Sequence, residues 1–390
     1  MNKLINSMSF YFLFPAYVAL ALLFGFFHVP EGYYPSLLSF YSVITLPILL
    51  ITTMLPLRMK LGSYYQLMAA KPHYRFVILS ACFFIVICGP LDIYVNGFKL
   101  LAPDTYADIF GVGRYIRHVT ILCWLFVPVS FLFVRSFLMK SLFIGYALLF
   151  PILIIDRNRF ILSCYSLFLC TMLAKSNSTE NSKFKSDFLI FFIPILCLLI
   201  FSIVGHFRTG SEFVVPSSGG FLKSEYFPLK DSFSTLPRLL QQVVLYITTP
   251  IFNLATISSL DFINQDFLLS QFSPFSRESF DAYPYAPVLV PRFNVGTEFY
   301  PFLLYKGLGL VVFAFIGMLL SFIISFLLFK RSPNIFTFLI FIRISYNALF
   351  MGFAPQFYIL LNLMFIILML VLWFFAELIR ASKLIEELQD

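Results

Sequence analysis

The chain alternates between long runs of apolar residues and short polar gaps. A helix needs about 20 apolar residues to cross about 30 Å of hydrocarbon. Most runs approach that length, the fifth and sixth are shorter, and the eighth is longer. The pattern gives ten candidate spans: 9–27, 37–57, 76–94, 119–139, 141–155, 160–174, 188–205, 302–329, 335–353 and 355–376. We therefore expect an all-α polytopic integral membrane protein with about ten transmembrane helices.

The composition excludes a soluble protein. Hydrophobic residues make up 60% of the 390 residues, charged residues make up only 12%, and the mean hydropathy is +0.90. A soluble chain carries about a quarter charged residues. The 53 Phe and 21 Tyr add aromatic area that a water-facing surface cannot hide. The solvent of this chain is therefore expected to be a lipid bilayer.

A stretch of 97 residues, 206–302, separates the seventh span from the eighth. Its one strongly apolar run, 239–260, is predicted to be an interfacial or re-entrant helix. A crossing there would reverse the sidedness of the later gaps and place Lys330 and Arg331 outside. The expected divisions are N-terminal spans at 1–205, a large exported loop at 206–302, C-terminal spans at 303–376 and a cytoplasmic tail at 377–390.

Lysine and arginine in the short gaps predict the orientation, because they accumulate on the cytoplasmic side. Thirteen basic residues fall in one alternating set of gaps, which predicts that both termini are cytoplasmic. Twelve fall on the other side, and eight of these are Arg, against four of the thirteen. Topology selection does not distinguish Arg from Lys, whereas a guanidinium grips phosphate at two points and stays charged. The exported face is therefore predicted to hold anions.

The first candidate site is Asp156-Arg157-Asn158-Arg159, which lies between two apolar runs of about 15 residues. Guanidinium groups at the membrane boundary are costly unless they are paired or used. Arg157 and Arg159 are therefore either snorkelling residues of a helical hairpin turn or a clamp for a lipid-linked diphosphate.

The second candidate site is GHFRTG, 205–210, where the seventh span ends. Glycine lets the backbone approach a ligand closely. His206 titrates near neutral pH and is a candidate base, and Arg208 is a candidate anion ligand. The alternative is that both are ordinary residues of the membrane interface.

The third candidate site is the second half of the large loop, where Arg277 and Arg292 lie among aromatic residues. Glu278, Asp281 and Glu298 are candidates to deprotonate a sugar hydroxyl. The alternative is a solvated loop with ordinary surface charges, and an interfacial aromatic belt would show the same pattern.

Metal and nucleic-acid sites leave no signal in the sequence. The six cysteines lie inside apolar segments without metal-ligand spacing, which is typical of small buried hydrophobic residues. A block of interleaved basic and aromatic residues, typical of a nucleic-acid surface, is also missing. We expect neither a tightly held metal nor a nucleic-acid partner.

At these residues the chain resembles the Wzy-type O-antigen polymerases, the oligosaccharide repeat-unit polymerases of bacterial surface polysaccharides. RNRF at 157–160 resembles the Arg at the exported mouth of a mid-chain helix pair, and GHFRTG at 205–210 resembles the segment that opens the family's large loop. YITTPIFNL at 246–254 and NVGTEFYPFLLYKGLGL at 294–310 resemble its tyrosine-proline segment and its Asn-x-x-Thr run. Lys306 stands where the family has an acidic residue, so the chain departs from the family pattern at that position.

The resemblance implies a glycosyltransferase of the bacterial inner membrane, with the metal-independent, all-helical GT-C-like architecture of O-antigen ligases and no cofactor. The donor would be a growing glycan on undecaprenyl diphosphate, and the acceptor a single lipid-linked repeat unit, both at the periplasmic face. A separate Wzz-type regulator would set the chain length. The expected roles are diphosphate binding for Arg157, Arg159, Arg208, Arg277 and Arg292, hydroxyl activation for His206 or Glu298, and glycan contact for Asn294 and Tyr246.

Two other functions remain open on the residues. An O-antigen ligase shares the fold and the donor and differs in the acceptor, and the Asn294–Leu310 run favours the polymerase. A flippase for lipid-linked oligosaccharides belongs to a different class, keeps its charges in a central cavity, and has short loops. The long exported loop with its Arg residues argues against the flippase.

Overall fold

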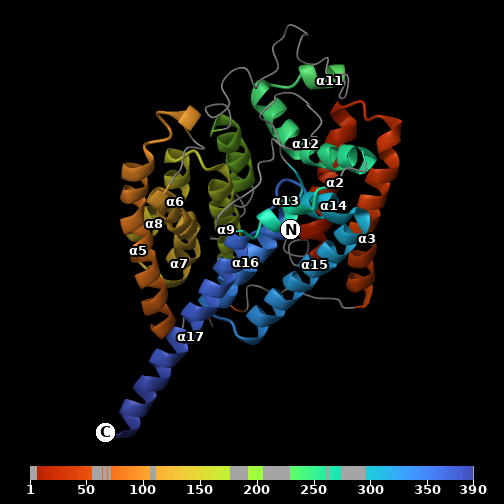
Figure 1. Cartoon of the computed structure of the whole chain (residues 1–390). Helices are drawn as coiled ribbons and strands as arrows, with labels where there is room; N and C mark the ends of the chain where they lie inside the picture. The colour runs from red at the N-terminus through yellow and green to blue at the C-terminus, as the bar shows by residue number, and fades with distance from the viewer. Residues whose placement is uncertain are drawn as a thin grey trace. The chain divides into compact units, whose positions relative to one another are not determined.

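The computed structural model of the protein describes residues 7–54, 64, 68, 72–105, 111–175, 192–204, 229–260, 263–273 and 296–389. In these residues the regular structure is helical (Figure 1). The one β-type pairing among them is an isolated antiparallel bridge between Phe27 and Leu229. The all-α prediction is confirmed.

Eleven of the α-helices in the described part of the chain have eight residues or more and are labelled in Figure 1. They are α2 (Met8–Phe26), α3 (Tyr34–Met54), α5 (Pro72–Asn96), α6 (Gly111–Thr120), α7 (Phe126–Phe133), α8 (Phe137–Leu153), α9 (Arg157–Lys175), α12 (Arg238–Leu260), α15 (Leu308–Arg331), α16 (Ile335–Leu349) and α17 (Leu360–Gln389). A further helix spans Phe192–Val204. The short elements are the 3-10 helices η1 (Glu31–Tyr33), η3 (Pro103–Thr105) and η4 (Ile121–Leu125) and the helices α11 (Asp231–Ser234), α13 (Gln265–Ser270) and α14 (Tyr300–Lys306).

Seven segments among the described residues are helical, long and apolar enough to cross a membrane: Met8–Phe26, Glu31–Thr53, His73–Asn96, Gly111–Phe133, Arg238–Ser259, Leu308–Arg331 and Leu360–Ser382. Large apolar side chains on these segments are exposed, for example Phe83 and Phe374. In water such a surface would drive aggregation, whereas lipid tails accept it. The protein is a multi-pass membrane protein.

Each of the ten predicted spans coincides with a helix, although not every helix is a full-length span. Six of the ten match six of the seven long segments, and three match shorter apolar helices, Phe137–Leu153, Phe192–Val204 and Ile335–Leu349. The tenth, 160–174, matches α9, whose first turn holds Arg157 and Arg159. The seventh long segment is α12, so its interfacial placement stays a prediction, as does the number of crossings.

Two boundaries differ from the predicted ones for local reasons. The long eighth run is split at Gly307, whose φ of 75° separates α14 from α15 and is a conformation that favours glycine. The fourth span ends at Phe133 instead of 139, so Arg135 lies in the connection to α8 and not inside a helix. At the other end of the chain, α17 continues through the predicted tail to Gln389.

The chain forms two compact units. The first unit comprises Met1–Met59, Gly210–Ile324 and Ile344–Met364, and the second comprises Lys60–Thr209, Ser325–Arg343 and Phe365–Asp390. Each unit therefore collects segments from distant parts of the sequence.

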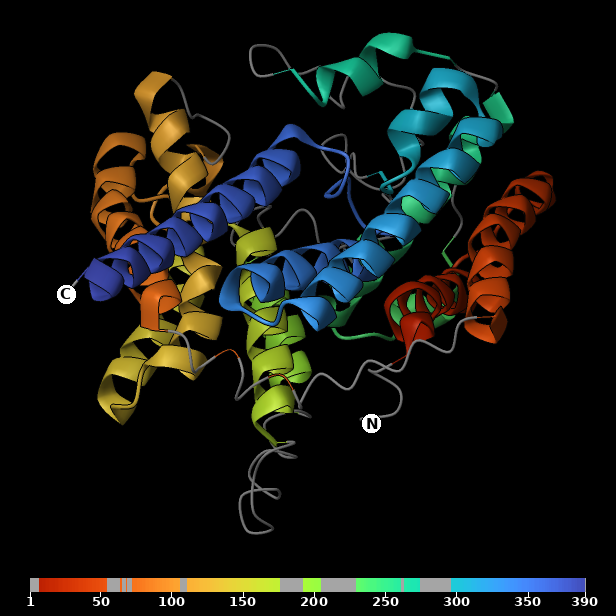
Figure 2. The same ribbon diagram turned by 90° about the horizontal axis from the view of Figure 1, so that it is seen from below.

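In the second unit, α5, α6, α7, α8 and α9 pack as neighbours (Figure 1). Buried Cys123, Phe150 and Ile154 form one part of its apolar core. Phe160 and Cys164 of α9 pack against Ile193 of the helix Phe192–Val204. Figure 2 shows the ribbons of the two helices from below.

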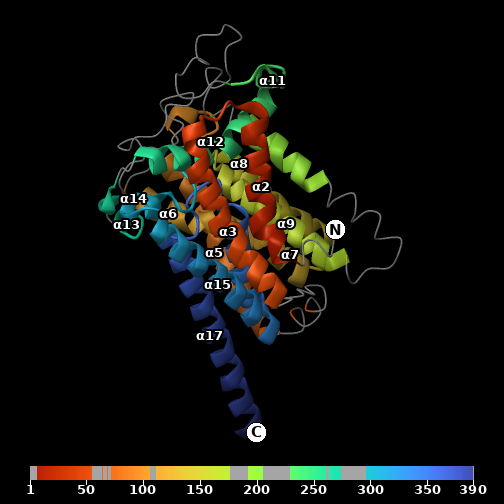
Figure 3. The same cartoon turned by 90° about the vertical axis from the view of Figure 1, so that its right-hand side faces the viewer.

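In the first unit, α2 runs beside α3 and α12 (Figure 3). Aromatic rings join α2, α3 and α15: Phe12 lies 5.8 Å from Phe315, and Phe40 lies 5.8 Å from Phe299. The Phe299 and Phe315 rings are 5.9 Å apart and close this cluster. It fixes the chain next to Glu298, a predicted site residue.

Candidate functional site

Arg157 and Arg159 begin α9, directly after the turn that ends α8. The Asp156 side chain accepts the Arg159 N–H at 3.1 Å, as an N-cap carboxylate does at a helix start. The preceding Ile155 has a φ of 55°, an uncommon conformation for a β-branched residue. Arg157 and Arg159 are both buried, with 5% and 4% of their surface exposed, so neither side chain snorkels into open solvent.

Arg159 joins α9 to the end of α6. Its Nε lies 2.8 Å from Asp156 Oδ2, its Nη1 donates to Thr120 Oγ1 at 3.3 Å, and its Nη2 donates to the Arg117 carbonyl at 3.1 Å. Immediately beyond Thr120 the helix tightens into the 3-10 segment η4. Such a change of pitch inside a helix often marks a strained or functional position.

Asp92 of α5 is the anionic centre of this cluster and is fully buried. Its carboxylate accepts from Arg117 Nε at 2.8 Å, from Thr120 Oγ1 at 2.6 Å and from Asn96 Nδ2 at 2.6 Å. Asn96 also donates to the Gly113 carbonyl at 3.0 Å. These bonds fasten α5 to α6, and through Arg159 they extend to α9.

Gly113 is required by this contact between α5 and α6. A Cβ atom at this position would lie 2.1 Å from Asn96 Oδ1. A side chain there would therefore push the Asn96 amide away from Asp92.

The charges that meet in the buried cluster are balanced. Two guanidinium groups, on Arg117 and Arg159, pair with two carboxylates, on Asp92 and Asp156. Arg117 Nη2 is buried and has no hydrogen-bond partner among the described residues. The Arg157 guanidinium lies 5.1 Å above the Phe201 ring, a cation–π arrangement. A buried guanidinium donor that has no partner among the described residues suits a bound anion.

Arg159 of the cluster was predicted from the sequence together with its neighbour Arg157, whereas Asp92, Thr120 and Asn96 were not. Arg117 is one of the twelve basic residues that the gap pattern places on the exported side, and no role was predicted for it. Asp92 could have been found from the sequence, because an acidic residue near the end of an apolar run such as 76–94 is costly unless it is paired. The sequence alone does not say with which of the exported Arg residues it pairs.

Glu298, a predicted catalytic residue, is fully buried in the first unit. Its Oε2 accepts the N–H groups of Gln356 at 2.5 Å and Phe357 at 2.8 Å, and its Oε1 accepts that of Tyr358 at 2.8 Å. Its own N–H donates to the Met351 carbonyl at 2.8 Å. The carboxylate thus anchors the loop before α17, and its role as a base stays a prediction.

Tyr358 extends this anchor to α15. Its hydroxyl donates to the Ala314 carbonyl at 2.6 Å. Burial, with the nearby charge of Glu298, raises the pKa of Tyr358 above the usual value for tyrosine. The hydroxyl therefore stays protonated at every pH the protein would meet, and the bond persists.

Tyr246, predicted to contact glycan, lies half-buried on α12. Gln242, Thr249 and Asn253 are spaced from it by four, three and seven residues, so the four side chains share one helix face. We call this face the α12 stripe. Neither polar atom of the Gln242 amide has a hydrogen-bond partner among the described residues, and the Thr249 hydroxyl has none either. Gln242 was not identified from the sequence.

Replacing Gln242 with leucine is expected to raise the free energy of unfolding by about 1–3 kcal/mol, because the change removes a buried amide without hydrogen bonds. Gln241→Leu is the matched control, since Gln241 Nε2 donates to the Phe233 carbonyl at 3.2 Å and its loss should destabilise. Thermal unfolding in detergent measures both. A less stable Gln242→Leu protein would show that the Gln242 amide makes hydrogen bonds in the folded protein.

Seven candidate site residues lie outside the described residues, and their roles stay predictions: His206, Arg208, Arg277, Glu278, Asp281, Arg292 and Asn294. In the ranges the structure covers, no group of three or more His, Cys, Asp or Glu side chains is placed to hold a metal ion. No family model, curated protein or solved structure matches the chain.

Proposed function

We propose that the chain is a membrane glycosyltransferase of the O-antigen polymerase type. It transfers a growing glycan from undecaprenyl diphosphate to the non-reducing end of a new lipid-linked repeat unit. The reaction takes place at the periplasmic face of the bacterial inner membrane, in a GT-C-like helical scaffold. A Wzz-type protein is the proposed regulator of chain length.

The observation that carries the proposal is the buried arginine cluster of the second unit. In the transfer, the acceptor hydroxyl attacks the anomeric carbon of the donor, and the bond from that carbon to the diphosphate oxygen breaks. The diphosphate leaves with the electron pair, and the hydroxyl proton passes to a base, for which His206 is the proposed group. Preorganised guanidinium groups in a partly dry site stabilise the charge that develops on the leaving group.

The residues of the cluster have different proposed roles. Asp92 and Thr120 are positioning residues, because they hold Arg117 and Arg159 in place. Arg117 Nη2 and Arg157 supply the donors for the phosphate oxygens. Arg159 is engaged by three protein partners and therefore acts mainly by fixing the shape of the cluster.

The α12 stripe supports a glycan contact in the first unit. Sugars present many hydroxyl groups. Gln242 and Thr249, whose buried side-chain polar atoms have no hydrogen-bond partner among the described residues, could bind them. We place Tyr246, Gln242 and Thr249 in this role.

Deletion of the gene followed by a surface-glycan gel tests the function. A single repeat unit on lipid A–core, with the ladder of longer chains missing, is the expected result. Loss of all glycan from the core, with long lipid-linked chains accumulating, would show a ligase instead. Repeat units that stay on the cytoplasmic side would show a flippase.

Arg117→Lys in the complementing gene tests the arginine cluster. Lysine preserves an ion pair with Asp92 but removes the second donor, so we expect glycan transfer to fall about ten- to hundredfold while the protein stays folded. Arg114→Lys is the matched control, because Arg114 is exposed one turn earlier on α6. Equal ladders from both variants would remove Arg117 from the site.

A further inference from the structure

A second positively charged feature of the second unit lies apart from the arginine cluster. It is a groove of about 530 Å³ between the start of α5 and the connection from α7 to α8. Its lining residues are Arg75, Leu79, Phe133, Val134, Arg135, Ser136, Met139 and Phe143.

The groove carries two positive charges, and none of the described residues that line it is acidic. The side chains of Arg75 and Arg135 are both exposed, so they do not belong to a buried ion pair. Lys140, one turn into α8, lies over the Phe131 ring at 5.2 Å and adds a third positive charge nearby. Like charges gathered at one place repel each other, so the groove favours an anion.

The remaining walls of the groove are almost wholly apolar. Phe143 is fixed against Phe126 of α7, with the two ring centroids 5.2 Å apart. Leu79, Met139 and Phe133 continue this surface. A groove with guanidinium groups beside an aliphatic and aromatic wall matches an amphipathic ligand, one with an anionic head and a hydrocarbon chain.

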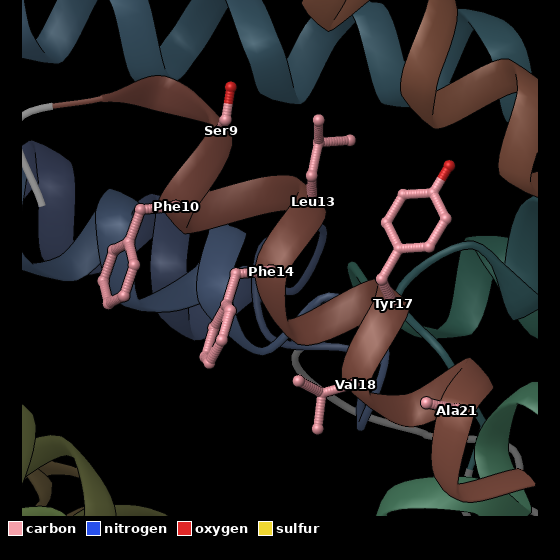
Figure 4. A pocket seen from close by; sticks show the side chains of 7 residues that line it. All are labelled: Ser9, Phe10, Leu13, Phe14, Tyr17, Val18 and Ala21. Carbon is pink, nitrogen blue, oxygen red and sulfur yellow. The ribbon is translucent and has the colours of Figure 1, made fainter. Parts of the chain in front are cut away.

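A hollow on α2 in the first unit lacks the charged residues of the groove and serves as a comparison. It has a volume of about 420 Å³, and its lining runs from Ser9 to Ala21 along a single helix without any charged residue (Figure 4). Such a surface accepts lipid tails but offers nothing to a headgroup. The groove beside Arg75 differs in drawing its walls from three helices and in holding two guanidinium groups.

The groove lies where headgroups are expected, because α5 and α8 both begin there. Ser136 precedes α8 and makes no side-chain capping hydrogen bond, so the unused N–H groups of the first turn add donors at this point. Arg75 is 17 residues before Asp92 on α5, which is about 26 Å at 1.5 Å per residue. The groove and the arginine cluster therefore lie at opposite ends of α5.

We propose that this groove binds the headgroup phosphate of an anionic phospholipid of the surrounding bilayer, with an acyl chain along the wall of Leu79, Met139 and Phe143. Arg75 and Arg135 hold the phosphate oxygens. The bound lipid joins α5 to the α7–α8 connection and so stabilises the second unit. The proposal does not depend on the enzymatic function.

Native mass spectrometry of the purified full-length protein with added phosphatidylglycerol tests the proposal. The variant is Arg75→Gln with Arg135→Gln. The matched control is Lys330→Gln with Arg331→Gln, which removes two charges from the end of α15, outside the groove. We expect the groove variant to bind phosphatidylglycerol at least about tenfold more weakly than the wild type, and the control to bind it normally.

Two further arms identify the ligand and check the fold. Glycerol phosphate, which has the headgroup without the chains, should not displace the lipid, and phosphatidylcholine should bind more weakly than phosphatidylglycerol. Reaction of the buried cysteines with a thiol dye during heating reports whether each variant is folded, and the single variant Arg135→Gln replaces the double one if the latter unfolds. Equal lipid binding by folded groove variant and wild type, or full displacement by glycerol phosphate, would overturn the proposal.

Discussion

Replacing Asp92 with alanine is expected to lower the free energy of unfolding by about 3–5 kcal/mol. The change leaves Arg117 as a buried, uncompensated charge and removes the acceptor for Thr120 and Asn96. Thermal unfolding in detergent, followed by a dye that reacts with the buried cysteines, measures the loss. We also expect the ladder of long glycan chains to disappear, because α6 and α9 lose their common anchor.

A double variant separates stability from binding in this cluster. Asp92→Leu together with Arg117→Met removes both charges and keeps most of the volume, which in other proteins restores much of the stability lost by removing one partner. We expect recovered folding without recovered glycan transfer, because the anion donors are gone. Recovered transfer in the double variant would contradict the role of Arg117 in anion binding.

Replacing Glu298 with alanine is expected to cost about 3–5 kcal/mol of folding free energy, because three backbone N–H groups lose their shared acceptor. The loss should appear as local opening of the loop before α17, and hydrogen exchange at Gln356, Phe357 and Tyr358 measures it directly. Unchanged protection of these amides would contradict the anchoring role.

The conservative variant Glu298→Gln distinguishes an anchor from a base. Glutamine keeps one acceptor oxygen for Gln356 and Phe357 but places an NH₂ group against the N–H of Tyr358, so we expect a smaller loss of stability. If Glu298 is an anchor, the rate of glycan transfer per folded molecule stays near normal. A folded but inactive Glu298→Gln protein would instead establish the base predicted from the sequence.

The positions of the helices followed from the sequence because hydropathy is a local property. Every predicted span coincides with a helix, and the errors occur at ends, as at Gly307 and in the connection that holds Arg135. The length of α17 was underestimated because its last turns are polar, and a helix that leaves the membrane keeps its backbone hydrogen bonds without an apolar sequence.

The candidate site was predicted only in part, because its members are distant in sequence. Arg157 and Arg159 stand out next to apolar runs, so their cost in a membrane is visible from the sequence. The partners of Arg159 are not, since Arg117 and Thr120 lie 42 and 39 residues earlier. Glu298 was selected as an acidic residue in a loop, although its burial against the loop before α17 depends on residues about 60 positions later.

The sequence by itself determined that this is a helical protein of the membrane. A chain in water could not shield so many apolar side chains from the solvent, and in a bilayer the backbone groups must form their hydrogen bonds within helices. Only the tertiary structure decided which charges meet. It brought Asp92 to Arg117, left Arg117 Nη2 without a hydrogen-bond partner among the described residues, and placed Arg75 beside Arg135 in one groove. The reason is that the pairing of buried charges depends on which helix faces pack together, and that packing is a property of the whole unit.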